Sequence, residues 1–224
     1  MFEYKLIRAK RRSIAASVRD GKLEVRAPLY YTQDDVDKFL ELKAQWIEKH
    51  LAESKSKLAQ RESFVLNYGD KVTYRGKQFP IVGKPGDMAG WNVISFYMPP
   101  DLPPEDIKYY CRTTFRLLAE KDLIPWTLEF ADEMDVEPSA IKINDAKARW
   151  GSCSAKGSVN FAWRLIMADD EVIEYLIVHE LSHMIEYSHS ARFWKVVESY
   201  IPDYKERKVR LKALQHKLSM ENWD

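Results

Sequence analysis

The first part of the chain alternates apolar and polar positions in the way that half-buried strands do. Apolar runs cover residues 5–8 and 13–19, and Asp20-Gly21 supplies a hairpin turn into residues 22–26. Pro28 closes that stretch, since proline has no amide hydrogen to contribute to a sheet. The pattern predicts a small sheet at the start of the chain.

A helical period replaces the alternation after Thr32, which is a good N-cap residue. Apolar positions then recur every three or four residues, and the pattern predicts one long helix that reaches about Ala59. Residues 64–81 and 91–98 are expected to be short strands, separated by the glycine-containing turns at 69, 76, 83 and 86.

Four prolines between Pro99 and Pro104 mark the clearest change in the chain, because neither a helix nor a central strand continues through them. We expect a β-rich N-terminal region with one long helix at residues 1–104 and a mainly helical region at 105–224. Short strands are predicted at 140–143 and 158–163. The fold class expected is α+β.

A further helix, called the decisive helix below because it contains the candidate chemistry, is predicted from Asp169-Asp170 to Glu186-Tyr187. Its almost wholly apolar interior indicates a central, buried element. Ser190 is expected to cap the next helix, which Pro202 ends. The tail after residue 204 is basic and amphipathic.

Composition excludes several classes of protein. The 224 residues carry a net charge of +1 and are 46% hydrophobic and 31% charged, an ordinary balance that argues against a globally basic nucleic-acid binder. No apolar run approaches the roughly 20 residues of a membrane span, and the start lacks a signal-peptide core. Two cysteines, Cys111 and Cys153, are too few for a disulfide framework, so we expect a cytoplasmic location.

Candidate chemistry is concentrated in the decisive helix, which contains the pattern H-E-x-x-H at residues 179–183. His179 and His183 lie on one helical face, about 6 Å apart along the axis, so both imidazoles can reach one metal ion. A catalytic zinc keeps one position for water, and Glu180 is placed to act as the general base and acid toward it. The pattern predicts a zinc (Zn2+) hydrolase.

The third metal ligand is open at this stage. His189 has the spacing of the metzincin pattern, but Glu186 stands where that pattern has glycine, and Glu186 is itself a rival ligand, with Glu198 a weaker one. The competing interpretation is a polar helix face with surface histidines, which an otherwise apolar helix disfavours.

These motifs, with R-W-G-S-C at residues 149–153, Trp163-Arg164-Leu165 and Phe193-Trp194, resemble the YgjP-like family of metal-dependent hydrolases. The N-terminal half is also similar to that family, in residues 12–14 and 25–28. The resemblance implies a zincin-like metallopeptidase fold with its catalytic region at 105–224. It also implies His179, His183 and His189 as metal ligands and Glu180 as catalytic acid/base. A more distant similarity extends to the SprT and WLM groups, which include proteases acting on DNA-bound proteins.

The segment around Gly151 has two interpretations. In the functional one, Arg149 binds a substrate carboxylate, Trp150 forms a wall of the pocket, and a strand at 159–163 or one near Trp150 offers its edge to an extended peptide. In the other, Trp150 is a core residue, Arg149 is in a salt bridge and Gly151 makes a turn.

The expected partner is a peptide or protein substrate, with no membrane association. Two alternatives remain. The basic residues between Lys5 and Arg26 favour a nucleic-acid-associated protease acting on DNA-bound proteins. A structural zinc, with four protein ligands, would instead make the chain a non-catalytic module.

Overall fold

A computed structural model describes residues 2–223, which form two compact units. One unit comprises residues 2–64 and 217–222, and the other comprises residues 65–216 with Trp223. The division therefore follows Phe64, whereas the sequence placed a boundary at residue 104. The difference has a physical reason: the strands between residues 71 and 98 pack against helical elements that come after the prolines. None of the helices among residues 2–223 has the length and apolar composition needed to cross a membrane.

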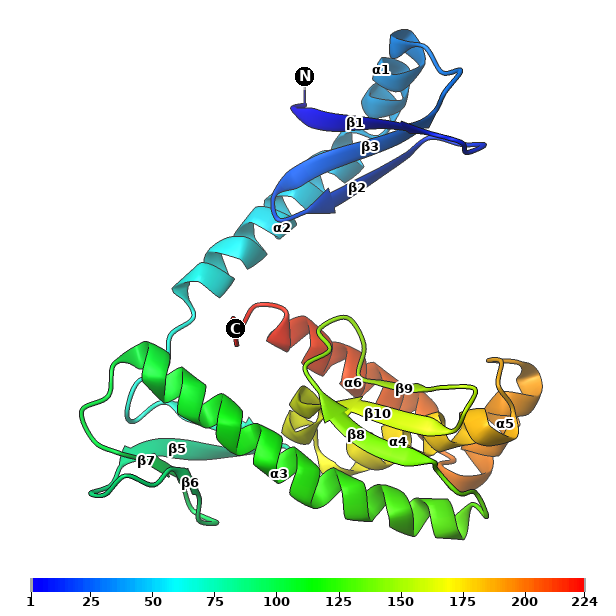
Figure 1. Cartoon of the computed structure of the whole chain (residues 1–224). Helices are drawn as coiled ribbons and strands as arrows, with labels where there is room; N and C mark the ends of the chain where they lie inside the picture. The colour runs from blue at the N-terminus through cyan, green and yellow to red at the C-terminus, as the bar shows by residue number, and fades with distance from the viewer. Residues whose placement is uncertain (1, 224) are drawn as a thin grey trace. The chain divides into compact units, whose positions relative to one another are not determined.

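The N-terminal unit is a three-stranded sheet covered by two helices (Figure 1). Strands β1 (Tyr4–Ala9) and β2 (Ala15–Arg19) flank β3 (Lys22–Pro28), with β1 parallel and β2 antiparallel to it. Val25, Val36 and Ile47 are fully buried between the sheet and the helices, so the alternating pattern of the sequence marks the core face.

Two helices replace the single one that was expected here. Helix α1 (Gln33–Leu42) begins at Thr32, which forms a capping box with Asp35 as its residue type predicts. Lys43 then leaves the helical conformation, and α2 (Ala44–Ser63) continues from it. No proline or glycine lies at this break, so the local sequence does not predict it.

The second unit holds two sheets and the remaining helices. A four-stranded sheet has the order β4-β5-β7-β6, formed by β4 (Lys71–Tyr74), β5 (Lys77–Gly83), β6 (Gly90–Trp91) and β7 (Phe96–Met98). Helix α3 (Pro104–Glu133) packs against this sheet and runs through Pro125 without ending.

A second sheet of this unit lies beside the H-E-x-x-H helix. It has the order β8-β10-β9, with β8 (Ala140–Asn144) parallel and β9 (Gly151–Cys153) antiparallel to the central β10 (Ser158–Ala162). The edge strand next to the helix is therefore β9, and β10 has no free edge. A short 3-10 helix, η1 (Trp163–Met167), leads from β10 toward α4 (Asp170–Ile185), and α5 (Ala191–Tyr200) and α6 (Tyr204–Leu218) follow (Figure 1).

Helix α4 is the centre of this unit. Asp169 caps its N-terminus by accepting a hydrogen bond from the amide of Val172, close to the predicted start. Ile173, Ile177 and Leu181 are fully buried, so the apolar character read from the sequence corresponds to packing on most sides. The protein has an α+β fold in which β9 and α5 pack against one buried helix, and α6 is held to the start of that helix by ion pairs.

Candidate metal centre

Three imidazoles converge where α4 meets the loop that leads to α5. One nitrogen from each of His179, His183 and His189 lies within 4.8 Å of the other two. The Nε2 atoms of His179 and His189 are 3.1 Å apart. His179 and His183 are one turn apart on α4, and the chain reverses after Ile185 to bring His189 back to them. The structure thus joins the three histidines that the sequence selected.

This nitrogen triangle fits a tetrahedral cation. Two zinc–nitrogen bonds of about 2.0–2.1 Å at a tetrahedral angle separate their nitrogens by roughly 3.3 Å. The observed 3.1 Å between His179 and His189 is close to that separation. His183 is also oriented for coordination, because its Nδ1 lies 2.9 Å from the carbonyl oxygen of Tyr187 and leaves Nε2 free. A divalent metal accepting three nitrogens can be held here.

The electrostatics keep two of these imidazoles neutral, as metal coordination requires. Burial, together with the charges of His183, His189 and Lys208, lowers the pKa of His179 from its ordinary 6.5 to about 3. The pKa of His183 is also lowered, first by burial and then by His189. The Nδ1 atom of His179 is buried without a hydrogen-bond partner among the described residues.

Aromatic side chains from α5 enclose the histidines. The Phe193 ring is fully buried and lies 4.5–5.0 Å, between ring centroids, from all three imidazoles. The Trp194 ring is stacked on His189 at 5.8 Å with an interplanar angle of 24°. Ser190 positions both rings by capping α5, where its hydroxyl accepts a hydrogen bond from the amide of Phe193. These rings restrict the rotation of the imidazoles.

The side chain of Glu180 reaches β9. Its carboxylate accepts a hydrogen bond from the backbone amide of Cys153, while its Oε2 atom is buried without a partner. Gly151 makes this approach possible, because a β-carbon at that residue would lie 2.5 Å from Glu180 Oε1 and 2.7 Å from Cγ. An unpartnered buried carboxylate oxygen beside a metal-binding cluster indicates a chemical task.

Backbone pairing explains why β9 presents its free edge to Glu180. The carbonyl of Trp150 accepts from Ala162, and the amide of Ser154 donates to Ser158. Alternate residues of an antiparallel strand face opposite sides, so the backbone groups of Gly151 and Cys153 are directed away from β10. Glu180 takes the outward amide of Cys153.

Burial makes Glu180 a stronger base than an ordinary carboxylate. The side chain is 4% exposed, and burial raises its pKa from 4.5 to about 7. The charge of Arg149 and the amide of Cys153 act in the opposite direction and limit the rise. A carboxylate that titrates near neutrality can both accept and return a proton at physiological pH.

The residues expected to contact substrate lie around this carboxylate. Arg149 is exposed and near enough to Glu180 to lower its pKa, so its charge is directed at the site. Trp150 is half-buried, and its Nε1 donates a 3.0 Å hydrogen bond to Gln215 on α6. The structure therefore places both residues at the rim of the site and leaves their substrate contacts as a prediction.

The structure gives the rival metal ligands and the expected turn at Gly151 other roles than those the sequence suggested. Among the described residues, the candidate metal cluster contains neither Glu186 nor Glu198. The carboxylate of Glu186 instead accepts a hydrogen bond from the hydroxyl of Ser188. Gly151 does not make a turn; it begins β9, and its importance is the space that it leaves for Glu180.

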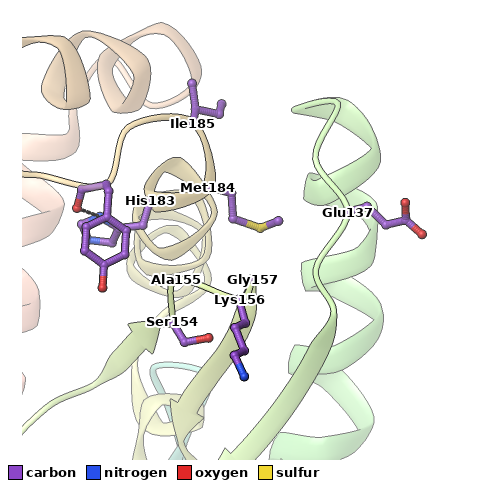
Figure 2. Close-up of a pocket in the computed structure, with 9 residues that line it drawn as sticks. Glu137, Ser154, Ala155, Lys156, Gly157, His183, Met184 and Ile185 are labelled. Carbon is purple, nitrogen blue, oxygen red and sulfur yellow. Dashed lines mark hydrogen bonds between the residues drawn. The ribbon is translucent and has the colours of Figure 1, made fainter.

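Two hollows adjoin the histidines. One has a volume of about 440 Å3 and reaches from His183 and Met184 to the loop at residues 154–157 and to Glu137. Figure 2 shows Met184 directed into this space, with Ser154 and Lys156 on the neighbouring loop. The other hollow, about 430 Å3, lies over Trp194 and is lined by residues of α5 and α6. The first hollow is lined by His183 itself, and the second reaches the cluster through Trp194, which stacks on His189.

Comparisons with known proteins agree with the chemistry of the site. Residues 12–214 match the YgjP-like metallopeptidase domain. This match spans most of the chain, so the protein belongs to the YgjP-like family. Its class is that of a metal-dependent peptidase. No curated protein matches the chain significantly.

Two solved structures show weaker similarity. The metallopeptidase zymogen abylysin of Pyrococcus abyssi is 24% identical, with a TM-score of 0.37, over 46% of this chain and 96% of its own. The metallopeptidase zymogen jannalysin of Methanocaldococcus jannaschii is 23% identical, with a TM-score of 0.37, over 42% of this chain and 96% of its own.

Proposed function

We propose that the protein is a zinc-dependent peptidase that hydrolyses peptide bonds, with His179, His183 and His189 as the metal ligands. One observation carries the proposal: the three imidazole nitrogens converge, and the same helix turn presents a buried carboxylate with a free oxygen. Three protein ligands leave a tetrahedral ion one open position, which a catalytic site requires and a structural site lacks.

A bound zinc ion would supply Lewis acidity toward the peptide carbonyl and would make water easier to deprotonate. Glu180 accepts the proton of the attacking water at its unpartnered Oε2 and delivers it to the amine that leaves. A pKa of about 7 suits both steps, because the protonated and the deprotonated forms of the carboxyl group are both populated at neutral pH. Gly151 and the amide of Cys153 hold the carboxylate for this transfer.

The substrate is proposed to lie along β9, the edge strand next to α4. An extended peptide can add to such an edge through backbone hydrogen bonds. Arg149 would then bind a carboxylate of the substrate, and Trp150, held by Gln215, would form a wall beside it. The location of these residues around Glu180 supports this arrangement.

The first experiment is metal content, measured by elemental analysis on the purified chain and on two variants. We expect about one zinc per chain in the native protein, loss of that zinc in His183→Ala, and retention in Glu180→Gln. Glu186→Gln serves as the control for the rival ligand and should keep its zinc. Retention in His183→Ala, or no zinc in any protein after zinc is added, would contradict the proposed site.

Activity and folding then separate catalytic from structural zinc. Zinc-loaded native protein should cleave a mixed peptide library, and Glu180→Gln should lose at least about 100-fold in rate, which is typical when a general base is removed. Chelation should abolish cleavage while the far-UV circular dichroism is kept. Unfolding on chelation, together with no cleavage by the loaded protein, would favour a structural metal instead.

A further inference from the structure

Helix α6 carries two sets of basic side chains on different faces. The arginines of one face are bonded to acids at the start of α4. Arg207 lies 2.8 Å from Glu174, and Arg210 forms ion pairs with Asp169 and Glu171. These pairs fasten α6 to α4, so the arginine charges are already neutralised.

The lysines of α6 lie in different surroundings. Lys205, Lys208 and Lys212 line the hollow of about 430 Å3 over Trp194, together with Tyr204 and Val209. Within residues 2–223, none of the three is in an ion pair. The ammonium of Lys208 is instead 4.7 Å from the centroid of the Trp194 ring, and that of Lys205 is 5.6 Å from the centroid of Tyr204. The hollow thus combines an aromatic floor with three unneutralised cations.

A column of rings connects this hollow to the histidine cluster. Tyr204 stacks on Trp194 at 5.1 Å with an interplanar angle of 16°, and Trp194 stacks on His189 at 5.8 Å. A group seated over Trp194 is therefore one aromatic ring away from a proposed metal ligand.

The other end of the lysine face reaches β9, the strand on which the peptide is proposed to lie. Lys208, Lys212 and Gln215 follow one another at four- and three-residue spacing, so they share a stripe of α6. Gln215 bonds to Trp150, the residue immediately before β9. The stripe thus runs from the ring beside His189 to the start of the strand on which the peptide is proposed to lie.

We propose that this hollow is a substrate subsite that binds a carboxylate of the peptide, either an acidic side chain or the C-terminal carboxylate. The inference rests on the proposed peptidase function and adds a substrate class to it. The aromatic floor accommodates the methylenes next to the carboxylate, and lysine ammonium groups donate to it from the rim. A neutral or cationic side chain would leave the three charges without a partner.

The test compares three zinc-loaded proteins: the native chain, the double variant Lys208→Gln/Lys212→Gln, and the matched control Lys77→Gln/Lys121→Gln. The control removes the same charge from exposed lysines of the same unit that lie outside the hollow. Chymotryptic peptides from denatured cellular protein are the first substrates, with cleavage sites identified by mass spectrometry. The best substrate is then synthesised with each acidic residue changed to its amide, and separately with an amidated C-terminus.

For the native and control proteins, we expect one of these neutralised peptides to be cleaved with a kcat/KM lower by roughly fivefold, the effect of one partly exposed charge pair. The Lys208→Gln/Lys212→Gln variant should cleave the acidic and neutralised forms at the same rate. Which neutralisation matters identifies the source of the carboxylate. Equal rates for all peptides with the native protein, or a lysine variant that keeps the native discrimination at every carboxylate, would overturn the inference; a preference that Arg149 provides would persist at one carboxylate only and would be lost in Arg149→Gln.

Binding separates failure of the subsite from failure of the peptidase. Alanine-glycine octapeptides labelled with the uncharged nitrobenzoxadiazole fluorophore and carrying one Glu or one Gln, each with a free or an amidated C-terminus, are titrated into Glu180→Gln protein at low salt. Carboxylate-dependent binding that needs Lys208 and Lys212 would support the subsite even if no peptide is cleaved. Cleavage of peptides without any carboxylate dependence would leave the peptidase standing and remove the subsite.

Discussion

The α-carbon of Gly151 faces the carboxylate of Glu180 so closely that a β-carbon on residue 151 would lie 2.5 Å from Oε1 and 2.8 Å from Cδ. Both distances are shorter than van der Waals contact allows. The obstructing atoms belong to a side chain that is also held by the amide of Cys153. The smallest residue of the chain is therefore required where β9 passes the proposed general base.

Replacing Gly151 by alanine should misplace this base without removing it. We expect Gly151→Ala to bind zinc normally and to lose roughly 100-fold in kcat, because displacements of about 1 Å in a catalytic group cost this much. Steady-state kinetics on the best peptide, together with metal analysis, test the expectation. Ser152→Ala on the same strand is the control and should be close to native. Native kcat in Gly151→Ala would show that the position of Glu180 is unimportant.

The raised pKa of Glu180 predicts how the stability of the metal-free protein depends on pH. The folded state holds a proton on this carboxyl up to about pH 7, whereas the unfolded chain releases it near 4.5. Between these values the folded state binds more protons, so this group lowers the free energy of unfolding as pH rises. Above pH 7 the ionisation of Glu180 lowers the free energy of unfolding by about 3 kcal/mol in total.

Glu180→Gln removes this cost, so the variant should gain stability relative to the native protein as pH rises from about 4.5 to about 7. The difference between the two proteins is the quantity to measure, since the lowered pKa of His179 acts in the opposite direction in both. Denaturant unfolding in the presence of chelator at several pH values provides it. A difference that stays constant across this range would contradict the burial of an ionisable Glu180.

The packing of Phe193 against all three imidazoles predicts an effect on metal affinity. Phe193→Leu leaves the ligands in place but frees their rings, and we expect zinc affinity to fall by about tenfold, in the range seen when groups that orient ligands are altered. Competition with a chromogenic chelator measures it. Val197→Ala, at another fully buried position of α5, controls for lost packing and should retain its zinc affinity. Equal losses in both variants would assign the effect to general loosening.

The two basic faces of α6 predict unequal effects of substitution on stability. Arg207 donates to Glu174, to Asp203 and to the carbonyl of Glu171. Arg207→Gln should therefore lower the free energy of unfolding by about 1–3 kcal/mol, as expected when hydrogen-bonded charges lose their partner. Lys208→Gln should change it by less than about 0.5 kcal/mol. Urea unfolding of both variants measures these changes in the free energy of unfolding. Equal losses in the two variants would contradict the prediction.

Local signals in the sequence were sufficient for the elements whose ends are capped. Thr32, Asp169 and Ser190 begin helices where their side chains predict, and the apolar character of α4 corresponds to its burial. The break at Lys43 was not predictable, because no helix-breaking residue is present there. The division after Phe64 was missed for another reason: four prolines stop local structure, but packing between distant segments decides which elements share a core.

The same distinction between local signals and contacts between distant segments applies to the site. Spacing within one helix placed His179 and His183 together, and the loop after α4 brought His189 to them. The space that Gly151 leaves for Glu180 has no signal in the linear pattern. The basic tail was visible in the sequence, but the separation of its lysines from its arginines was not, because it arises from contacts between α6 and other elements.

The hydrogen bond between Glu180 and the amide of Cys153 has a consequence for where a bound peptide is cut. Of the three residues of β9, only Gly151 and Cys153 direct backbone groups outward, and Glu180 already occupies one of the two amides. A peptide pairing with this edge finds a single outward amide, that of Gly151, to align against. Side chains two residues apart along that peptide would then face the same side, so the choice of the cut bond would depend on alternate residues rather than on adjacent ones.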